Sequence, residues 1–182
     1  TTSSAWGTGT NWSGGSEPST GDTVYIDGAV SIDGVDKSAV NLAALYIRET
    51  YTGQFGTSSA NPVKVACAGE CSILGGSAVY LNSGASNPIV NLAVAMPQPD
   101  RVFDLGGTVT YGVFLRGTIT SAATFTNSAF EPLDDNPLNL PNLTFTAGTH
   151  TVADLINCTA KVTAATTFTT GNCINAVVWN HA

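Results

Sequence analysis

Residues 23–34 read TVYIDGAVSIDG, and this stretch decides the fold class. It contains two short runs in which apolar and polar side chains alternate, at 24–26 and 30–32. Such alternation predicts a β-strand with one buried face, because successive side chains point to opposite sides. Each run ends at an Asp-Gly pair, which favours a tight turn. The stretch therefore predicts short strands joined by sharp bends.

The same rhythm continues along the rest of the chain, where β-branched residues dominate and Gly, Asn, Asp or Pro separate the runs. The best helical pattern, residues 36–45, is short and runs directly into a strand pattern. The sequence therefore predicts an all-β protein. We expect strands at residues 23–26, 30–32, 44–48, 63–66, 72–74, 78–81, 89–95, 102–105, 108–115, 118–120, 124–126, 143–146, 149–152, 160–163, 166–169 and 176–179.

Two architectures accommodate many short strands. One is a parallel β-helix, or solenoid, and the other is a β-sandwich of the jelly-roll kind. The shortness of the strands and the Gly and Asn residues at the bends favour the solenoid, although no fixed repeat length is found. The expected organisation is an N-terminal cap or arm at 1–22, a solenoid body at 23–120, an extended loop or arm at 121–142, and C-terminal strands at 143–182.

Charge and hydropathy narrow the class of partner. Only 10% of the 182 residues are charged, and the net charge is −7. The six Lys and Arg residues are scattered and form no basic stripe, so nucleic acid is not an expected partner. No apolar run approaches the roughly 20 residues of a membrane-spanning helix, so a membrane is not expected either.

The four cysteines are Cys67, Cys71, Cys158 and Cys173. They are candidates for disulfides, and pairing of 67 with 71 and of 158 with 173 is one of three possible connectivities. Buried free thiols are the alternative. The C-x3-C spacing and the wide separation of the two pairs argue against a zinc site, so no metal is expected.

Aromatic residues in two segments are the candidate binding residues. Trp6 and Trp12 lie among glycines just before the first clear strand, and we expect them to cover the open end of a β stack. A sugar-stacking platform is the alternative. Phe125 and Phe130 lie in the expected loop at 121–142, where they would be anchors in a neighbouring protein, or else would pack into their own core.

The N-terminal third carries a resemblance to a known family. The pattern N-W-S-G-G-x-x-P-x-x-G-D-T-V at residues 11–24, with the segments 28–30, 38–47 and 51–53, resembles a family of bacteriophage virion proteins. It is also similar to the opening of bacterial surface β-helix proteins. The resemblance covers residues 6–56 and implies β-helical coils, a homo-oligomer that is often a trimer, and a role as capsid decoration protein, fibre or spike.

Motifs of catalysis are absent from the sequence. There is no G-x-S-x-G nucleophile elbow, P-loop or dinucleotide-binding glycine motif. The acidic residues, such as Asp27 and Asp33, are typical turn formers, although a carboxylate pair for glycoside cleavage is a third option. The expectation is therefore a protein that is not an enzyme and needs no cofactor.

The absence of catalytic motifs favours a role in assembly, and the resemblance of the N-terminal third implies a virion structural protein. The expected function is that of a capsid decoration (cement) protein, which binds the outer capsid surface and stabilises the shell. Its partners would be the major capsid protein or other virion proteins, and its location the capsid exterior. A tail fibre or spike component, or an extracellular carbohydrate-binding β module, is the alternative.

Overall fold

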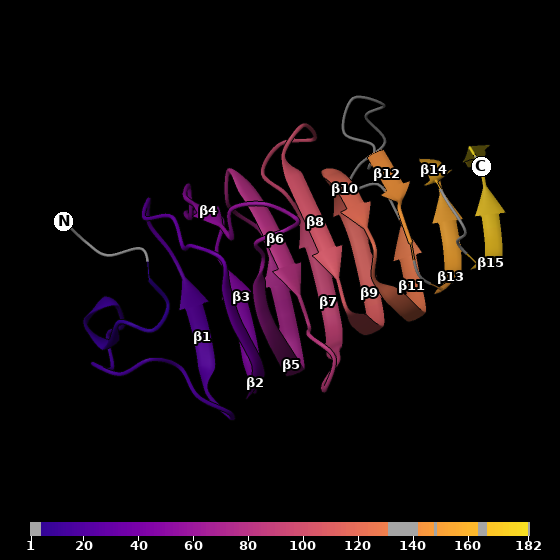
Figure 1. Ribbon diagram of the computed structural model, residues 1–182. Helices are drawn as coiled ribbons and strands as arrows, with labels where there is room; N and C mark the ends of the chain where they lie inside the picture. Colours follow the sequence, from indigo (N-terminus) through magenta and orange to yellow (C-terminus); the bar gives the residue numbers. More distant parts are fainter. Residues whose placement is uncertain (1–4, 131–141, 148, 164–166, 182) are drawn as a thin grey trace.

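The chain forms a parallel β-solenoid of about six turns, seen in a computed structural model that describes residues 5–130, 142–147, 149–163 and 167–181. Figure 1 shows the coils side by side along one axis, with the N-terminal segment at one end and the C-terminal strands at the other. The predicted solenoid is thereby confirmed. In the described part of the chain, the helical structure consists of a single 3₁₀ turn, η1 (Gly9–Asn11).

Most of the strands are short, and their bounds are as follows: β1 (Thr23–Ile26), β2 (Val35–Leu42), β3 (Ala44–Ile47), β4 (Gln54–Phe55), β5 (Val63–Ile73), β6 (Ala78–Asn82), β7 (Ile89–Ala95), β8 (Val102–Gly106), β9 (Thr108–Arg116), β10 (Thr118–Ser121), β11 (Thr124–Phe130), β12 (Asn142–Phe145), β13 (Thr149–Ile156), β14 (Thr159–Thr163), β15 (Thr167–Ile174) and β16 (Val177–His181).

The strands form two parallel stacks that meet where β5 pairs with β6. One stack runs β5-β7-β9-β11-β13-β15 and the other β6-β8-β10-β12-β14-β16, so each coil adds one strand to each stack. At the N-terminal end, β2 and β3 pair with β5, β1 pairs with β3, and β4 pairs with β6. Every named pair is parallel, as a solenoid wound in one direction requires.

Buried side chains stack in register from coil to coil. In one such ladder each coil contributes an inward-facing residue that pairs with its counterpart in the next coil. The ladder consists of Ile26, Ile47, Ile73, Val94, Phe114, Phe130, Leu155 and Cys173. From Ile47 to Leu155 its members have no exposed surface, so the core is a continuous column of stacked apolar side chains.

Phenylalanine rings fill the middle of this column. The rings of Phe114 and Phe130 stack with their centroids 4.5 Å apart, and Phe125 meets Phe114 edge to face at 5.6 Å. Gly112 makes room for them, since a Cβ atom there would lie 2.9 Å from the Phe114 ring. The buried Ser128 occupies the same ladder position one coil later, so small residues offset the bulk of the rings.

The lack of a fixed repeat length in the sequence has a structural cause. Register partners in successive coils are separated by 21 residues for Cys71 and Leu92, by 16 for Gly112 and Ser128, and by 18 for Leu155 and Cys173. The stacked strands hold the register, while the connections between them differ in length. Counting residues along the sequence therefore misses a periodicity that exists only in the strand pairing.

Some predicted elements differ from the structure. The segment 30–32 is not a strand, and of its residues Ile32 forms one bridge to Phe55. The helical pattern at 36–45 lies in β2 and β3. The expected strand at 63–66 and residues 72–73 of the one expected at 72–74 belong to a single strand, β5, which bends instead of ending.

The expected loop at 121–142 also requires correction. Its first part contains β11, which pairs with β9 and β13 as a regular member of the solenoid. Residues 131–141, with the prolines and the Asp pair that suggested a loop, lie outside the described residues. Phe125 and Phe130 belong to β11 and have exposed fractions of 1% and 0%. They pack into their own core because their register positions face inward, so they are not available as anchors for a partner.

Replacing Phe130 with alanine should destabilise the protein by about 3–5 kcal/mol, because it opens a cavity between Phe114 and Phe145. The free energy of unfolding, measured with a chemical denaturant, tests this. Tyr111→Ala, on the exposed face of the neighbouring strand β9, is the control and should change it by about 0.5 kcal/mol or less. Equal effects of the two substitutions would contradict the placement of Phe130 in the core.

Candidate functional site

A lid formed by residues 5–22 covers the β1 end of the solenoid (Figure 1). Trp6 is its central side chain and has an exposed fraction of 2%. Its ring contacts Trp12 edge to face at a centroid distance of 4.9 Å and Phe55 at 6.3 Å. An aromatic side chain that closes the apolar end of a β stack prevents exposure of the core, which is the role expected of Trp6 and Trp12.

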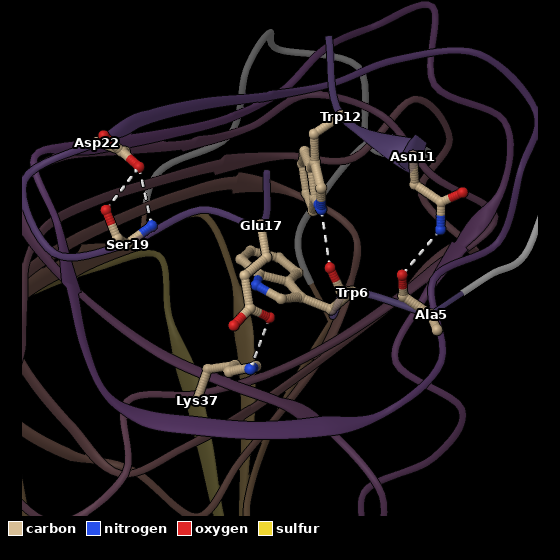
Figure 2. A network of polar contacts seen from close by, with 8 residues as sticks. All are labelled: Ala5, Trp6, Asn11, Trp12, Glu17, Ser19, Asp22 and Lys37. Carbon is tan, nitrogen blue, oxygen red and sulfur yellow. Dashed lines mark hydrogen bonds and ion pairs between the residues drawn. The ribbon is translucent and has the colours of Figure 1, made fainter. Parts of the chain in front are cut away.

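Hydrogen bonds within the lid fix its shape (Figure 2). The indole Nε1 of Trp12 donates to the backbone oxygen of Trp6 at 2.7 Å, and the Asn11 side chain donates to the Ala5 oxygen at 2.8 Å. Backbone amides of Asn11 and Trp12 donate to Thr8 and Gly9 in the 3₁₀ turn. The hydrogen bond from Trp12 to Trp6 thus fixes the two tryptophans relative to one another.

The lid is fastened to the first coil. The backbone amide of Gly21 donates to Asn41 at 3.0 Å, and that of Ala43 donates to Asp22 at 2.9 Å. The ammonium of Lys37 lies 2.8 Å from the Glu17 carboxylate, as Figure 2 shows. This ion pair is partly exposed and contributes little stability, so the backbone bonds carry most of the attachment.

A cavity of about 380 Å³ lies between the lid and β1. Its walls include Trp12 from the lid, Tyr25 from β1 and Val30 from the following loop. Tyr25 and Val30 are exposed, with fractions of 54% and 44%. The cavity is therefore an open, partly aromatic surface at the capped end of the solenoid.

The aromatic wall of this cavity is organised by strand register. Tyr25 pairs with Tyr46 of β3, and their rings stack at 5.0 Å with an interplanar angle of 13°. The guanidinium of Arg48 lies 4.6 Å from the Tyr25 ring centroid and 3.8 Å from the Asp27 carboxylate. The hydroxyl of Tyr46 donates to Glu70 at 3.0 Å, and this hydrogen bond raises the pKa of Tyr46. Cation–π contact and stacking together hold Tyr25 in one orientation.

One polar atom of the lid stands out. The indole Nε1 of Trp6 is buried and has no hydrogen-bond partner among the described residues. Leaving a buried N–H without a partner costs about 1–3 kcal/mol. Burial of the large indole ring offsets this cost, which indicates that Trp6 is retained for its apolar area.

At the opposite end of the solenoid, β15 and β16 are the last described strands. In the described residues β15 pairs with β13 alone and β16 with β14 alone, so both strands have one edge without a strand partner. Cys173 is exposed, whereas Phe130 and Leu155, which occupy the same ladder position in the two preceding coils, have no exposed surface. The inward column is therefore uncovered at this end.

Two exposed apolar residues flank the corner of the last coil. Ile174 and Val177 have exposed fractions of 52% and 51%, and between them Asn175 has a left-handed backbone with φ of 51°. The same corner occurs one coil earlier at Asn157, where φ is 45° and the amide donates to the Ile174 oxygen at 2.9 Å. We call the segment from Thr167 to His181 the end coil.

Sequence reasoning missed Ile174 and Val177, and a short internal repeat could have located them. Residues 155–160 read LINCTA and residues 173–178 read CINAVV, with the Ile-Asn pair at the same place. Asparagine is the residue other than glycine that most readily adopts a left-handed backbone. The repeated pair therefore marks equivalent corners of the last two coils.

The four cysteines are present as free thiols. Cys67, Cys71 and Cys158 are buried, and burial raises the pKa of Cys158 to about 11. Within the described residues no three His, Cys, Asp or Glu side chains are close enough together to hold a metal ion. The same residues contain no helix that is both long and apolar enough to cross a membrane.

In comparisons with known proteins, no family model, curated protein or solved structure matched this chain.

Acid should loosen the lid end of the solenoid. The pKa of Asp36 is lowered to about 2, first by hydrogen bonds from Ser38 and then by Lys64. Hydrogen bonds from Ser19 and from Thr50 lower the pKa values of Asp22 and Asp27 as well. A carboxylate with a depressed pKa stabilises the fold above its unfolded value of 3.8, and this contribution disappears as the pH falls toward 2.

We therefore expect Asp36→Asn to lower the melting temperature at neutral pH, and expect the difference from the unmodified chain to vanish near pH 2. Thermal unfolding followed by circular dichroism at several pH values measures this. The control is Asp100→Asn, at an exposed position in the loop before β8. A difference for Asp36→Asn that persists unchanged at pH 2 would rule out the carboxylate as its source.

The two tryptophans of the lid should differ in their contribution to stability. Trp6→Ala should lower the free energy of unfolding by about 3–5 kcal/mol, because the buried ring leaves a cavity at the end of the core. Trp12→Phe keeps most of the ring and loses one hydrogen bond, so it should cost about 0.5–1.5 kcal/mol. Denaturant unfolding measures both. If Trp6→Ala leaves stability unchanged, the tryptophan is not a cap.

Proposed function

We propose that this chain is a virion structural protein that acts by assembly, as a capsid decoration (cement) protein on the outer surface of the shell. The observation that carries the proposal is the difference between the two ends of the solenoid. At one end the lid around Trp6 covers the core, whereas at the other end, among the described residues, the core position of Cys173 is exposed.

The end coil is the docking surface in this proposal. Open strand edges can pair with a strand of a partner, and exposed apolar residues beside them provide area for burial. Ile174 and Val177 lie next to these edges. The lid covers the buried core at the other end, so the end coil is the face that presents core positions to a partner.

The nature of the partner follows from the resemblance of residues 6–56 to phage virion proteins. We propose the major capsid protein or another virion protein as the surface that is bound, and a homotrimer as the assembled state. A fibre or spike component is the alternative within this class, and it would use the same open end to join the rest of the fibre.

Substitution of the end coil provides a test of docking. The double variant Ile174→Asp and Val177→Asp should weaken attachment to particles by roughly 30-fold or more, as expected for about 2 kcal/mol lost at an interface centre. The control is Val30→Asp, which places one aspartate on an exposed valine at the lid end, to be compared with Val177→Asp alone as well as with the double variant. Co-sedimentation with particles that lack the chain measures attachment, and circular dichroism confirms folding.

Equal weakening by the control and the double variant would contradict docking through the end coil. Mass spectrometry of purified virions tests the broader proposal, because a decoration protein must be present in a defined number of copies. Its absence from virions would overturn the proposed function. Light scattering of the free protein at micromolar concentration tests the trimer, and a monomer would refute it.

A carbohydrate-binding module is the second candidate, and the cavity beside the lid favours it. Trp12 and the oriented, exposed ring of Tyr25 line this cavity, and sugar rings stack on such aromatic faces. A glycan array would detect binding, and Tyr25→Ala should abolish it without unfolding the chain. A negative array leaves the assembly proposal as the sole one.

A further inference from the structure

The coil of β5 turns a corner between two cysteines. Cys67 pairs with Ile89 of β7, and Cys71 pairs with Leu92. All four side chains are buried in the core. Ile89 and Leu92 are three residues apart, and in a straight strand such residues would point to opposite faces. Both can face inward because the strand bends between them, so the side chains that flank the bend converge on its inner side.

β5 contains one more residue than β7 at this corner. Four positions separate Cys67 from Cys71 where three separate their partners, and the register shifts between Cys67 and Glu70. Gly69 lies at the bulge, where a Cβ atom would collide with the Ala43 oxygen of the preceding coil. The backbone at Gly69 therefore lies close against the preceding coil at the point where the register shifts between the two cysteines.

The two thiols interact with one another on the inner side of the corner. The Sγ atom of Cys67 donates to the Glu70 oxygen at 3.2 Å, which places it beside the residue that precedes Cys71. The Cys71 thiol forms a hydrogen bond with Cys67 and lowers the pKa of Cys67 to about 7, while the pKa of Cys71 is raised. The two thiols therefore lie beside one another on the inner side of the corner.

We propose that Cys67 and Cys71 form an intramolecular disulfide across this corner when the chain meets a small-molecule disulfide as oxidant. The bond requires two converging thiols on one short segment, and the bulge at Gly69 provides them. The proposal is independent of the assembly function, because both residues lie in the core and away from the end coil.

Glutathione disulfide is an oxidant of the required class. The Cys67 thiolate attacks one of its sulfurs, forming a mixed disulfide and releasing one glutathione thiolate. Cys71 then loses its proton and attacks Cys67 Sγ, which releases the second glutathione. The two cysteine thiols lose two electrons and two protons in total, and glutathione disulfide accepts them to become two thiols.

The second pair of cysteines lies in a different setting. Cys158 follows β13 and is buried, whereas Cys173 lies on β15 and is exposed. They belong to successive coils. A disulfide between them would therefore link two turns of the solenoid, whereas one between Cys67 and Cys71 would lie within a single turn. A linkage map distinguishes the two pairings, because proteolytic peptides with Cys67 and Cys71 are separate in sequence from those with Cys158 and Cys173.

The test is a linkage map of the full chain. The protein is refolded in glutathione buffers of rising disulfide fraction, so that the oxidant meets β5 before the coil closes. Free thiols are then blocked with maleimide in denaturant, and the protein is digested without reduction. We expect peptides in which Cys67 and Cys71 carry no maleimide and together lack two hydrogen atoms, with the double variant Cys158→Ser and Cys173→Ser giving the same result.

Full maleimide labelling of both Cys67 and Cys71 at the highest disulfide fraction would overturn the proposal. Links from either residue to Cys158 or Cys173 would also overturn it. Stability provides a second readout. The oxidised chain should unfold at a higher denaturant concentration than the reduced chain, and Cys71→Ala should abolish this shift while the double variant at Cys158 and Cys173 retains it.

Discussion

The in-register stacking of parallel coils is the constraint on which the rest of the structure depends. Each buried side chain rests on its counterpart one coil earlier, as Ile73 does on Ile47 and Phe130 on Phe114. Parallel pairing satisfies the backbone within the stack, and the stacked side chains exclude water from the column between the two rows of strands. A residue that is too large in one coil must be offset in a neighbouring one, as Gly112 and Ser128 offset the phenylalanine rings.

Much of this fold could be predicted from local sequence, because local features determine strands and bends. Alternation around Val24 and Ile26 identified a strand, and the tryptophans among glycines identified a covered end. The inward orientation of Phe125 and Phe130 was harder to predict. Their position near prolines favoured a loop, and only the pairing of β11 with β9 shows that they face inward. Register between distant segments is not encoded in any one segment, and unequal connections conceal the repeat.

The candidate site could be predicted only in part, because some of its features are local in sequence and others depend on the neighbouring coils. Trp6 and Trp12 are recognisable by residue type, so the lid could be anticipated. Ile174 and Val177 are ordinary strand residues whose exposure depends on the absence of a further described coil beside them. Likewise, the spacing of Cys67 and Cys71 does not reveal that the strand bends between them, since the bulge is defined against β7. Features that arise from neighbouring coils thus require the structure.

The placement of the lid at the β1 end also affects how the chain reaches its native state. Synthesis on the ribosome delivers the lid and β1 before the other coils, and each later coil then emerges beside an edge that is already formed. Contacts in the solenoid join each coil mainly to its neighbours, so every step closes a loop of only a few tens of residues. The covered end thereby gives folding a starting point and a direction, from the first coil toward the last.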